Sequence, residues 1–340
     1  MAVLVTGGAG YIGSHMTWAL LDAHEDVVVL DRLSTGFRWA VPSEARFYRG
    51  DVGDKVLLAR IFDENSIDAV VHFAGSAIVP ESVANPLAYY ENNTGNTRTL
   101  IEAGVKAGIG GFVFSSTAAV YGSQDGAEPV RETTALHPES PYGLSKLMAE
   151  LILRDAAAAH DFSYVALRYF NVAGADPLGR TGQSTTGATH LIKVACEAAL
   201  GKRPKVDIYG TDYSTPDGTG IRDYIHVADL VEAHMRALAY LRAGGEPLIS
   251  NCGYGEGFSV LQVIDTIRRI SGRDIAVKHG PRRPGDIARI VADPALARLK
   301  LGWVPAHASL DQIVESAFAW EEHLSRKNSY DLPRPQMRLV

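Results

Sequence analysis

The sequence predicts an α/β protein in which a doubly wound parallel sheet carries a smaller α/β lobe at its C-terminal side. Short β-branched runs alternate with longer segments of helical periodicity as far as residue 170, a pattern typical of parallel sheets covered by helices on both faces. A glycine-rich turn joins the first run to the first helical segment. Beyond residue 170, long segments rich in Gly, Thr, Asp and Pro appear, and long loops of this kind are usually functional. The length of 340 residues fits two domains.

The sheet elements follow one another in a regular order. Strands are expected at residues 2–6, 27–31, 69–73, 111–115 and 164–168, and helices at 11–23, 54–65, 86–107 and 141–159. A helix at 228–242 and a strand at 248–252 are expected to return to the sheet. Amphipathic helices at 259–271 and 310–325 are expected in the smaller lobe, and the tail 329–340, which contains prolines, is expected to be loosely held.

Composition excludes several classes of protein. The net charge of −6 and a pI near 6.0 argue against a surface for nucleic acid or anionic membrane, which needs a basic excess. The two cysteines, Cys196 and Cys252, are too few for a disulfide framework or a Cys-rich zinc site, and we expect no metal. No apolar run is long enough to span a membrane and the chain begins without the basic segment of a signal peptide. A cytoplasmic location is therefore expected.

The glycine-rich turn has the spacing of a dinucleotide-binding loop. Its glycines Gly7, Gly10 and Gly13 would serve in turn a tight bend, a close approach to a pyrophosphate and close packing of the helix. The helix that follows would present its first N–H groups to the phosphates. An ordinary glycine-rich turn is the alternative. The dinucleotide reading is favoured because Asp31 lies 18 residues beyond Gly13 at the end of the next strand.

The acidic residues after the second and third strands bear on the choice of cofactor. Asp31 could accept a hydrogen bond from a ribose 2′-hydroxyl and would repel a 2′-phosphate, which favours NAD over NADP. The neighbouring Arg32 points the other way, because an arginine can accommodate that phosphate. Asp51 ends the segment 47–51 and could accept from the adenine amino group, but a solvated turn aspartate is nearly as good an interpretation.

A tyrosine and a lysine are placed for acid–base chemistry. Ser140 and Pro141 suit the start of a helix, on which Tyr142 and Lys146 would share one face. A nearby ammonium is expected to lower the pKa of the phenol and make it a usable base. The strand at 112–117 ends in hydroxyl groups, which could bind the same substrate oxygen. For Tyr142 and Lys146 taken alone, the alternative is an exposed pair of side chains, four residues apart on a helix, that has no function.

With these residues in order, the sequence resembles the extended short-chain dehydrogenase/reductases, and within them the epimerases that act on UDP-glucose and UDP-galactose. The resemblance covers nearly the whole chain. Its markers are Thr6–Ser14, His72–Gly75 with Glu81 and Ser82, Tyr89–Asn93, Phe114–Gly122, Pro141–Lys146, Arg168–Gly174, Gly218–Val227 and Arg282–Asp286.

The resemblance implies a Rossmann sheet, bound NAD, a homodimer, and interconversion of the two UDP-sugars through a 4-keto sugar with transient hydride transfer at C4. It implies that Tyr142 is the catalytic base, that Lys146 is its partner and holds the nicotinamide ribose, and that Thr117 is the catalytic hydroxyl. The implied cofactor residues are Gly7, Gly10, Tyr11, Ile12, Gly13, Asp31, Asp51, Val52, Phe73, Ala74, Gly75, Asn92, Ser115, Tyr142, Lys146 and Tyr169. The implied substrate residues are Thr117, Asn171, His190, Leu191, Tyr209, Arg222, Arg283 and Asp286.

Some of these assignments have independent support and others depart from the family. A UDP diphosphate needs neutralising charge, which arginine supplies bidentately, although loop arginines such as Arg222 and Arg283 are more often simply solvated. Ser76 and Ala77 stand where some members have a lysine that contacts the cofactor, so that contact is absent. His190 stands where some members have an asparagine.

Alternative functions remain open at this stage. An NDP-sugar 4,6-dehydratase shares the fold, but such relatives carry Asp-Glu where Ala118 and Ala119 follow Thr117. An epimerase of N-acetylated or pentose UDP-sugars, or a nucleotide sensor without catalysis, are further alternatives. The predicted division assigns residues 1–170 and 224–253 to the NAD-binding domain and residues 171–223 and 254–340 to the UDP-sugar lobe, with the substrate between them.

Overall fold

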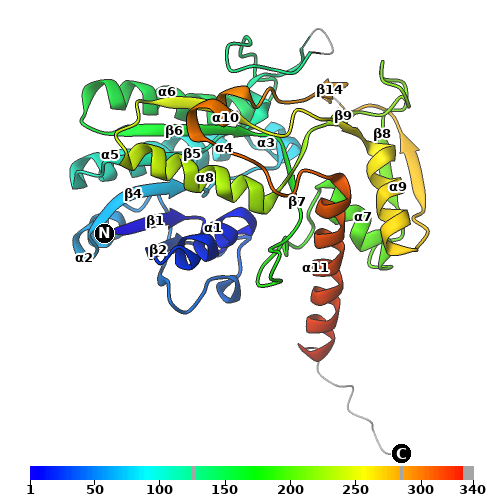
Figure 1. Ribbon diagram of the computed structural model, residues 1–340, viewed down its shortest axis with the longest axis horizontal. Coiled ribbons are helices and arrows are strands. Elements are labelled where there is room, and N and C mark those ends of the chain that lie inside the picture. Colours follow the sequence, from blue (N-terminus) through cyan, green and yellow to red (C-terminus); the bar gives the residue numbers. More distant parts are fainter. Residues whose placement is uncertain (125–127, 284–285, 332–340) are drawn as a thin grey trace, which may run out of the picture.

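The central feature of the molecule is a sheet of seven parallel strands, in the order β11-β6-β5-β4-β1-β2-β3 (Figure 1). The computed structural model describes residues 1–124, 128–283 and 286–331. The strands are β1 (Ala2–Thr6), β2 (Asp26–Asp31), β3 (Arg46–Arg49), β4 (Ile67–His72), β5 (Gly111–Ser115), β6 (Ser163–Tyr169) and β11 (Leu248–Cys252). The parallel, doubly wound sheet is confirmed, and the strand predicted at 248–252 returns to its edge beside β6.

Helices cover both faces of this sheet (Figure 1). One face carries α1 (Tyr11–Asp22) and α8 (Val227–Arg242), and the other carries α2 (Lys55–Glu64), α5 (Asn96–Ala107) and α6 (Pro141–Ala159). Successive residues of a strand point to opposite faces, so Val3 and Val5 of β1 belong to the apolar cluster under α1 and α8, while Leu4 belongs to the cluster under α2, α5 and α6. Burial on both faces explains why these strands read as continuous apolar runs.

The helix predicted at 86–107 is divided into three parts. It consists of α4 (Pro86–Tyr89), a π-helical turn (Tyr90–Gly95) and α5. A π-turn adds a residue to the helical repeat and is common at functional sites. Here it changes the direction of side chains between the two α-helical parts, which the periodicity of the sequence does not reveal. The structure also contains short helices that the sequence did not predict, namely α3 (Val79–Ala84), α7 (Leu191–Ala199) and α10 (Ala295–Leu301).

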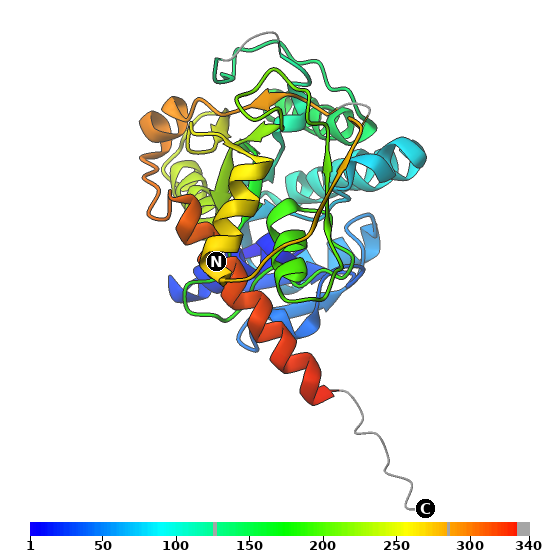
Figure 2. The same cartoon turned by 90° about the vertical axis from the view of Figure 1, so that its right-hand side faces the viewer.

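The smaller lobe lies beside the carboxyl ends of the strands (Figure 2). Its helices are α7, α9 (Val260–Ser271) and α11 (Leu310–Asp331). Its short strands are β7 (Asn171–Ala173), β8 (Val206–Tyr209), β9 (Ile221–Arg222), β10 (Tyr224–His226), β12 (Phe258–Ser259), β13 (Val277–Gly280) and β14 (Arg289–Ile290). They pair as β10-β7, β13-β8 and β12-β9-β14, so the segments before β10 and after β11 build the lobe together.

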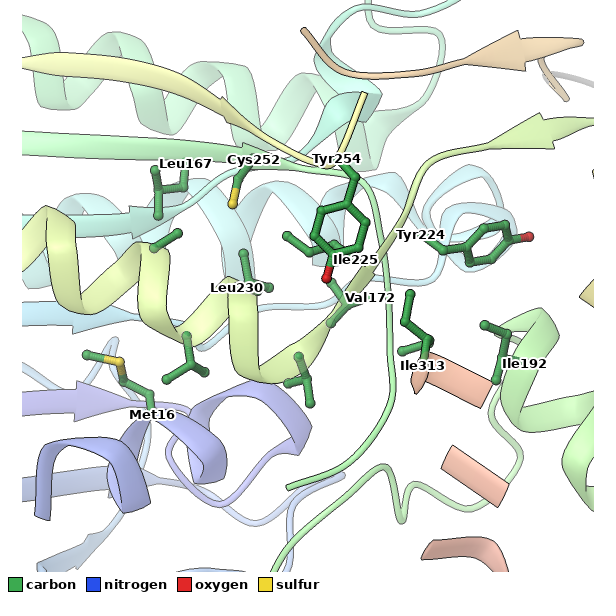
Figure 3. Close-up of a cluster of buried hydrophobic side chains, with 14 of the residues drawn as sticks. Met16, Leu167, Val172, Ile192, Tyr224, Ile225, Leu230, Cys252, Tyr254 and Ile313 are labelled. Atoms are coloured by element: carbon green, nitrogen blue, oxygen red, sulfur yellow. The ribbon is translucent and has the colours of Figure 1, made fainter. Parts of the chain in front are cut away.

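A single apolar cluster joins the sheet to the lobe. Figure 3 shows Met16 and Leu230 on the sheet side, Ile192 and Ile313 on α7 and α11, and Ile225 between them. Because these side chains belong to one buried cluster, the lobe is packed directly on the sheet. The boundaries drawn at residues 170, 223 and 253 therefore separate elements that share a core, and the two-domain division stays a prediction.

The last helix of the structure is longer than the sequence predicts. Helix α11 continues through Asp331, beyond the predicted end at residue 325 and into the tail expected to be loose, while the rest of that tail, 332–340, lies outside the described residues. Within the described part of the chain, the helices are too short or too polar to cross a membrane.

Candidate active site

The predicted cofactor residues form a row along the carboxyl edge of the sheet. Tyr169 ends β6, Ser115 ends β5, the segment 73–75 follows β4, Gly7 follows β1 and Asp31 ends β2. These strands are neighbours in that same order. Ligands of doubly wound sheets bind at this edge, so the topology brings together residues that are up to 162 positions apart (7 to 169).

The glycine loop forms a cradle that side chains would fill. Gly7 has a positive φ of 70°, and a Cβ at this position would lie 2.7 Å from the backbone nitrogen of Ala74. A Cβ at Gly13 would lie 2.1 Å from the carbonyl oxygen of Gly7. Gly10 is the N-cap of α1 and adds no side chain there. The backbone at the start of α1 is therefore open to a phosphate group, which the N-terminus of a helix attracts.

Asp31 supports the loop as well as ending its strand. Its carboxylate accepts hydrogen bonds from the backbone nitrogens of Ala9 at 2.9 Å and Leu33 at 2.7 Å. Leu33 has a φ of 63°, an uncommon conformation for a residue with a side chain. Such strained backbone concentrates at ligand sites, and here the Asp31 carboxylate holds it in place.

Arg32 and Asp51 contact each other, which bears on both open interpretations. The Arg32 guanidinium donates to the Asp51 carboxylate at 2.9 Å, so the arginine that could have favoured NADP is already paired. Asp51 also accepts from Asn96 at 2.8 Å and from the backbone of Gly53 at 2.8 Å. Asp51 is thus held by three hydrogen bonds and is not a freely solvated turn residue, while its contact with the adenine stays a prediction.

The predicted catalytic residues come together in a buried group. Ser140 caps α6 as expected, accepting from the backbone of Gly143 at 3.2 Å. Tyr142 and Thr117 are both buried, and the Thr117 hydroxyl lies close enough to the phenol to act on its pKa. Lys146 is also buried, which excludes the interpretation of Tyr142 and Lys146 as an exposed pair.

Burial is the largest influence on the electrostatics of this group. Burial raises the pKa of Tyr142 above its usual value, and the Thr117 hydroxyl lowers it only in part. Burial also lowers the pKa of Lys146 to about 8. The Lys146 ammonium donates to the carbonyl oxygen of Ser115 at 3.0 Å and lies 4.9 Å over the Phe114 ring. Burial is therefore the largest influence on the pKa of Tyr142 in this arrangement, and the effect of Lys146 on that pKa stays a prediction.

Other cofactor-side residues are held by specific contacts. The Tyr11 hydroxyl donates to the carbonyl oxygen of Gly174 at 2.7 Å and so links the glycine loop to the lobe. Burial raises the pKa of Tyr169, and the Ser115 hydroxyl is hydrogen bonded to the His234 ring at 2.9 Å. The Asn92 side chain donates to the Ser76 hydroxyl at 2.9 Å. Ile12 and Val52 lie within the α1 start and the turn after β3.

The predicted substrate residues gather in the lobe. The Arg283 guanidinium lies 4.7 Å over the ring of Tyr209 and pairs with Asp286 at 2.8 Å. Arg222 is close enough for the charges of both Arg283 and Asp286 to act on its pKa. Pro284 and Gly285, which belong to the predicted motif, lie outside the described residues.

The remaining substrate residues lie on other elements. Asn171 begins β7, next to the end of β6, and its backbone donates to Asp223 at 3.0 Å. Leu191 begins α7, and His190 is its N-cap. The exposed His190 ring is hydrogen bonded to Gln183 at 2.8 Å, and among the described residues it forms no hydrogen bond with Arg222, Arg283 or Asp286.

Sequence reasoning missed several polar residues that organise the site. Asn93, in the π-helical turn, accepts from the backbone of Ser76 at 2.8 Å and donates to Ser145 on α6 at 3.0 Å. Asp223 accepts from the backbone of Tyr254, Gly255 and Ala292. The only signal in the sequence was their position beside predicted motifs, which does not reveal partners that are distant in the chain.

The row of strand-end residues, the glycine cradle and the buried Tyr142 and Thr117 side chains define a protein of the dinucleotide-dependent class that acts on a hydroxyl-bearing substrate. Residues 3–253 match the family model described as the NAD dependent epimerase/dehydratase family. The chain belongs to this family and, within it, to the UDP-glucose 4-epimerases.

Three relatives carry this conclusion. A UDP-glucose 4-epimerase of Azospirillum brasilense is 56% identical over 95% of this chain and 93% of the relative. A UDP-glucose 4-epimerase of Brucella ovis, solved in complex with NAD, has a TM-score of 0.90 and 44% identity, covering 94% of this chain and 97% of the other. A UDP-Glc/GlcNAc 4-epimerase of Campylobacter jejuni has a TM-score of 0.83 and 46% identity, covering 95% of this chain and 99% of the other. The cofactor of the family is NAD, and the glycine cradle and Asp31 of this chain fit it.

Among residues 1–124, 128–283 and 286–331, no three His, Cys, Asp or Glu side chains are arranged to hold a metal ion.

Proposed function

We propose that this chain is an isomerase that interconverts UDP-galactose and UDP-glucose, with Tyr142, Lys146 and Thr117 as its catalytic residues. The observation that carries the proposal is that Tyr142, Lys146 and Thr117 are all buried, with Tyr142 and Lys146 on α6 and Thr117 just after the carboxyl end of β5, the edge at which ligands of such sheets bind. NAD, when bound, supplies the acceptor and donor of the C4 hydride. The sugar passes through a 4-keto form and no net oxidation results.

Tyr142 is the base that takes the proton from the sugar 4-hydroxyl and later returns it. The Thr117 hydroxyl lies beside the phenol, so it is placed to hydrogen bond to the same sugar oxygen. Because burial raises the pKa of Tyr142, deprotonation near neutral pH requires a positive charge near the phenol. Lys146, one turn further along α6, is the cation placed to supply that charge and to hold the nicotinamide ribose.

The UDP group is assigned to the lobe. Arg222 and Arg283 would neutralise the diphosphate, which a guanidinium binds bidentately, and Tyr209 would lie against the uracil. Asn171, His190, Leu191 and Asp286 complete the proposed substrate contacts. The sugar then lies between the strand ends of the sheet and the lobe, with the domain division at residues 170, 223 and 253 as part of the same proposal.

The deciding experiment is a direct assay of the reaction. Purified protein is incubated with UDP-galactose, and UDP-glucose is detected by a coupled oxidation. Steady conversion in both directions without added NAD supports the proposal. Failure to form UDP-glucose by a folded, NAD-containing protein contradicts it.

Two other functions are distinguished by the same sample. An NDP-sugar 4,6-dehydratase needs an acid to expel the 6-hydroxyl, and Ala118 and Ala119 offer none in the short helix that follows Thr117. Its product, a 4-keto-6-deoxy sugar, would be seen by mass spectrometry as a loss of water. A nucleotide sensor would bind UDP-sugars without converting them, and it would not require the intact Tyr142, Lys146 and Thr117 group.

The choice of sugar is tested at Ile290. We expect UDP-glucose and UDP-galactose to be better substrates than N-acetylated sugars, by a partial margin, because a hydrophobic pocket discriminates by only ~1–3 kcal/mol per methylene-sized group. In the family, the residue four positions after Asp286 lines the sugar pocket. Ile290 is 7% exposed in β14, opposite Arg222 of β9, and shares a buried cluster with Ala118 and Phe170.

For this position, Ile290→Tyr is expected to lower kcat/KM for UDP-N-acetylgalactosamine more than for UDP-galactose. The measurement compares both substrates in the wild type and the variant. Equal use of both sugars by the wild type would refute the preference. An unchanged ratio of kcat/KM values in the variant would show that Ile290 does not line the sugar pocket and is only a buried residue of β14.

NAD, and not NADP, is expected as the nucleotide released from the purified protein. The reason is the Asp31 carboxylate, whose charge repels a 2′-phosphate, together with the engagement of Arg32 by Asp51. Denaturation of the protein followed by chromatography of the released nucleotide checks this. A predominance of NADP would contradict the assignment.

A homodimer and a cytoplasmic location complete the proposal. Apolar side chains are exposed on the packed helices α3, α4 and α6, where Val83 is 63%, Leu87 78% and Leu151 41% exposed; covering such a patch by a second copy would remove it from water. Sedimentation of the purified protein is expected to show a dimer, and Leu151→Glu is expected to weaken it. The two buried cysteines without a disulfide are consistent with a reducing compartment.

A further inference from the structure

A buried ion pair lies directly behind the proposed catalytic residues. Glu150 is on α6, four residues beyond Lys146 and eight beyond Tyr142, so the three share a face of the helix. Both carboxylate oxygens of Glu150 accept from the Arg168 guanidinium, at 2.9 Å and 2.6 Å. Each residue of the pair is only 2% exposed.

The pair joins three elements that carry the site. The Ser116 hydroxyl donates to Glu150 at 2.5 Å, and Ser116 immediately precedes Thr117. Arg168 immediately precedes Tyr169 at the end of β6. Arg168 also donates to the Tyr121 hydroxyl at 3.1 Å, which donates to Asn251 of β11 at 2.6 Å. One carboxylate therefore connects the helix of Tyr142 to the strand ends that carry Thr117 and Tyr169.

Stability alone gives little reason for this arrangement. Removing two charges from water is costly, and well-packed apolar residues in place of a buried ion pair are often neutral or stabilising. The geometry points instead to a role in positioning: we propose that the Glu150–Arg168 pair orients Ser116, and through it Thr117, against Tyr142, and that its balanced charges set the protonation range in which Lys146 and Tyr142 work. This inference rests on the proposed catalytic roles of Tyr142, Lys146 and Thr117.

The charged and titratable neighbours support the electrostatic part. The charge of Glu150 favours the protonated form of Lys146 against the burial that lowers the pKa of that lysine. On β4, His72 faces Lys146, and burial lowers its pKa to about 3, so it stays neutral. Arg168 is bonded both to Glu150 and to the Tyr121 hydroxyl. The charges of Glu150, Arg154, Asp155 and Arg168 all act on Tyr164 of β6, whose pKa burial raises.

Removing the charge of one member of the pair should shift the pKa values of Tyr142 and Lys146. The direction of the shift depends on the sign of the charge that remains. Without the Glu150 charge, the Arg168 cation is uncompensated, and a positive charge favours the phenolate of Tyr142 and disfavours the ammonium of Lys146. Both pKa values then fall. Without the Arg168 charge, the Glu150 anion is uncompensated and both pKa values rise.

The test is the pH profile of kcat/KM for UDP-galactose in the NAD-loaded full chain. Glu150→Gln is expected to move both limbs of the profile to lower pH by on the order of one unit, and Arg168→Gln to move them to higher pH by a similar amount. Ser116→Ala keeps both charges, so it is expected to lower kcat about 10-fold with little change in KM and an unmoved profile. Glu232→Gln, which removes a surface carboxylate paired with Arg236 on α8, is the matched control and is expected to leave the profile unchanged.

Because a single charge deletion in the core can prevent folding, a double variant, Glu150→Leu with Arg168→Met, is included. It removes both charges, so its profile is expected to lie near that of the wild type, while kcat falls because Ser116 has lost its anchor. Shifts of the two single variants in the same direction, or a double variant and Ser116→Ala with the wild-type kcat, would overturn the inference. Inactivity of the wild type itself would instead refute the proposed function, so the two failures are distinguishable.

Discussion

Tyr142→Phe is expected to lower kcat for UDP-galactose by about 10²–10⁴-fold, the usual cost of losing a general base. The phenol lies beside the Thr117 hydroxyl, and phenylalanine keeps the ring while removing the oxygen that would take the proton. Since the ring is retained in a buried site, the fold and the bound NAD are expected to persist. Single-substrate kinetics, thermal unfolding and the nucleotide content of the variant measure the three quantities.

The matched control is Tyr164→Phe, which removes a hydroxyl from another buried tyrosine. Tyr164 lies near the amino end of β6, at the opposite end of the strand from Tyr169. The Tyr164→Phe variant is expected to keep the activity of the wild type. Turnover of Tyr142→Phe close to that of the wild type would reject Tyr142 as the base, whereas loss of activity together with loss of NAD would point to a disturbed cofactor site.

Lys146→Met is expected to lower kcat/KM by about 10²-fold or more and to move the optimum to higher pH. Methionine keeps an unbranched apolar stem beside Phe114 but removes the cation. Because burial already raises the pKa of Tyr142, losing a nearby positive charge raises it further and delays formation of the phenolate as pH increases.

The wild type gives the complementary expectation. Burial lowers the pKa of Lys146 to about 8, so the ammonium is present below that pH and is lost above it. Activity that depends on the cation should therefore fall on the alkaline side, and this fall should be absent from Lys146→Met. Lys106→Met, at an exposed lysine paired with Glu102 on α5, is the control. An unchanged profile in Lys146→Met would show that the lysine does not act on the phenol.

Much of the sheet was predictable because its signals are local. The strands at 2–6, 111–115 and 248–252 and the helix at 141–159 have the bounds that the sequence predicts. A buried parallel strand must be apolar on both sides, and α6 begins at a Ser-Pro pair that caps a helix. The glycine spacing likewise depends on steric requirements within a few residues. These elements needed no information from distant parts of the chain.

Other features depended on partners far apart in sequence. Nothing in the local pattern of Tyr90–Gly95 indicates a π-helical turn. Nothing near Lys146 indicates that its ammonium bonds to Ser115 or that burial raises the pKa of Tyr142. The gathering of Tyr209, Arg222 and Arg283 depends on the pairing of short strands that the sequence did not reveal.

The sequence by itself thus determined the fold class, the dinucleotide loop, the preference for NAD and the pairing of Tyr142 with Lys146, because spacing along one strand or helix encodes each of them. The choice of Thr117 among the hydroxyls that end the strand came from the resemblance to a known family. Only the tertiary structure decided how these groups are charged and held. The pKa of a buried side chain depends on every dipole and charge around it, and the Glu150–Arg168 pair joins residues 18 positions apart on different elements. Periodicity reports which face of an element is buried, but it carries no information about which polar group on another element lies opposite.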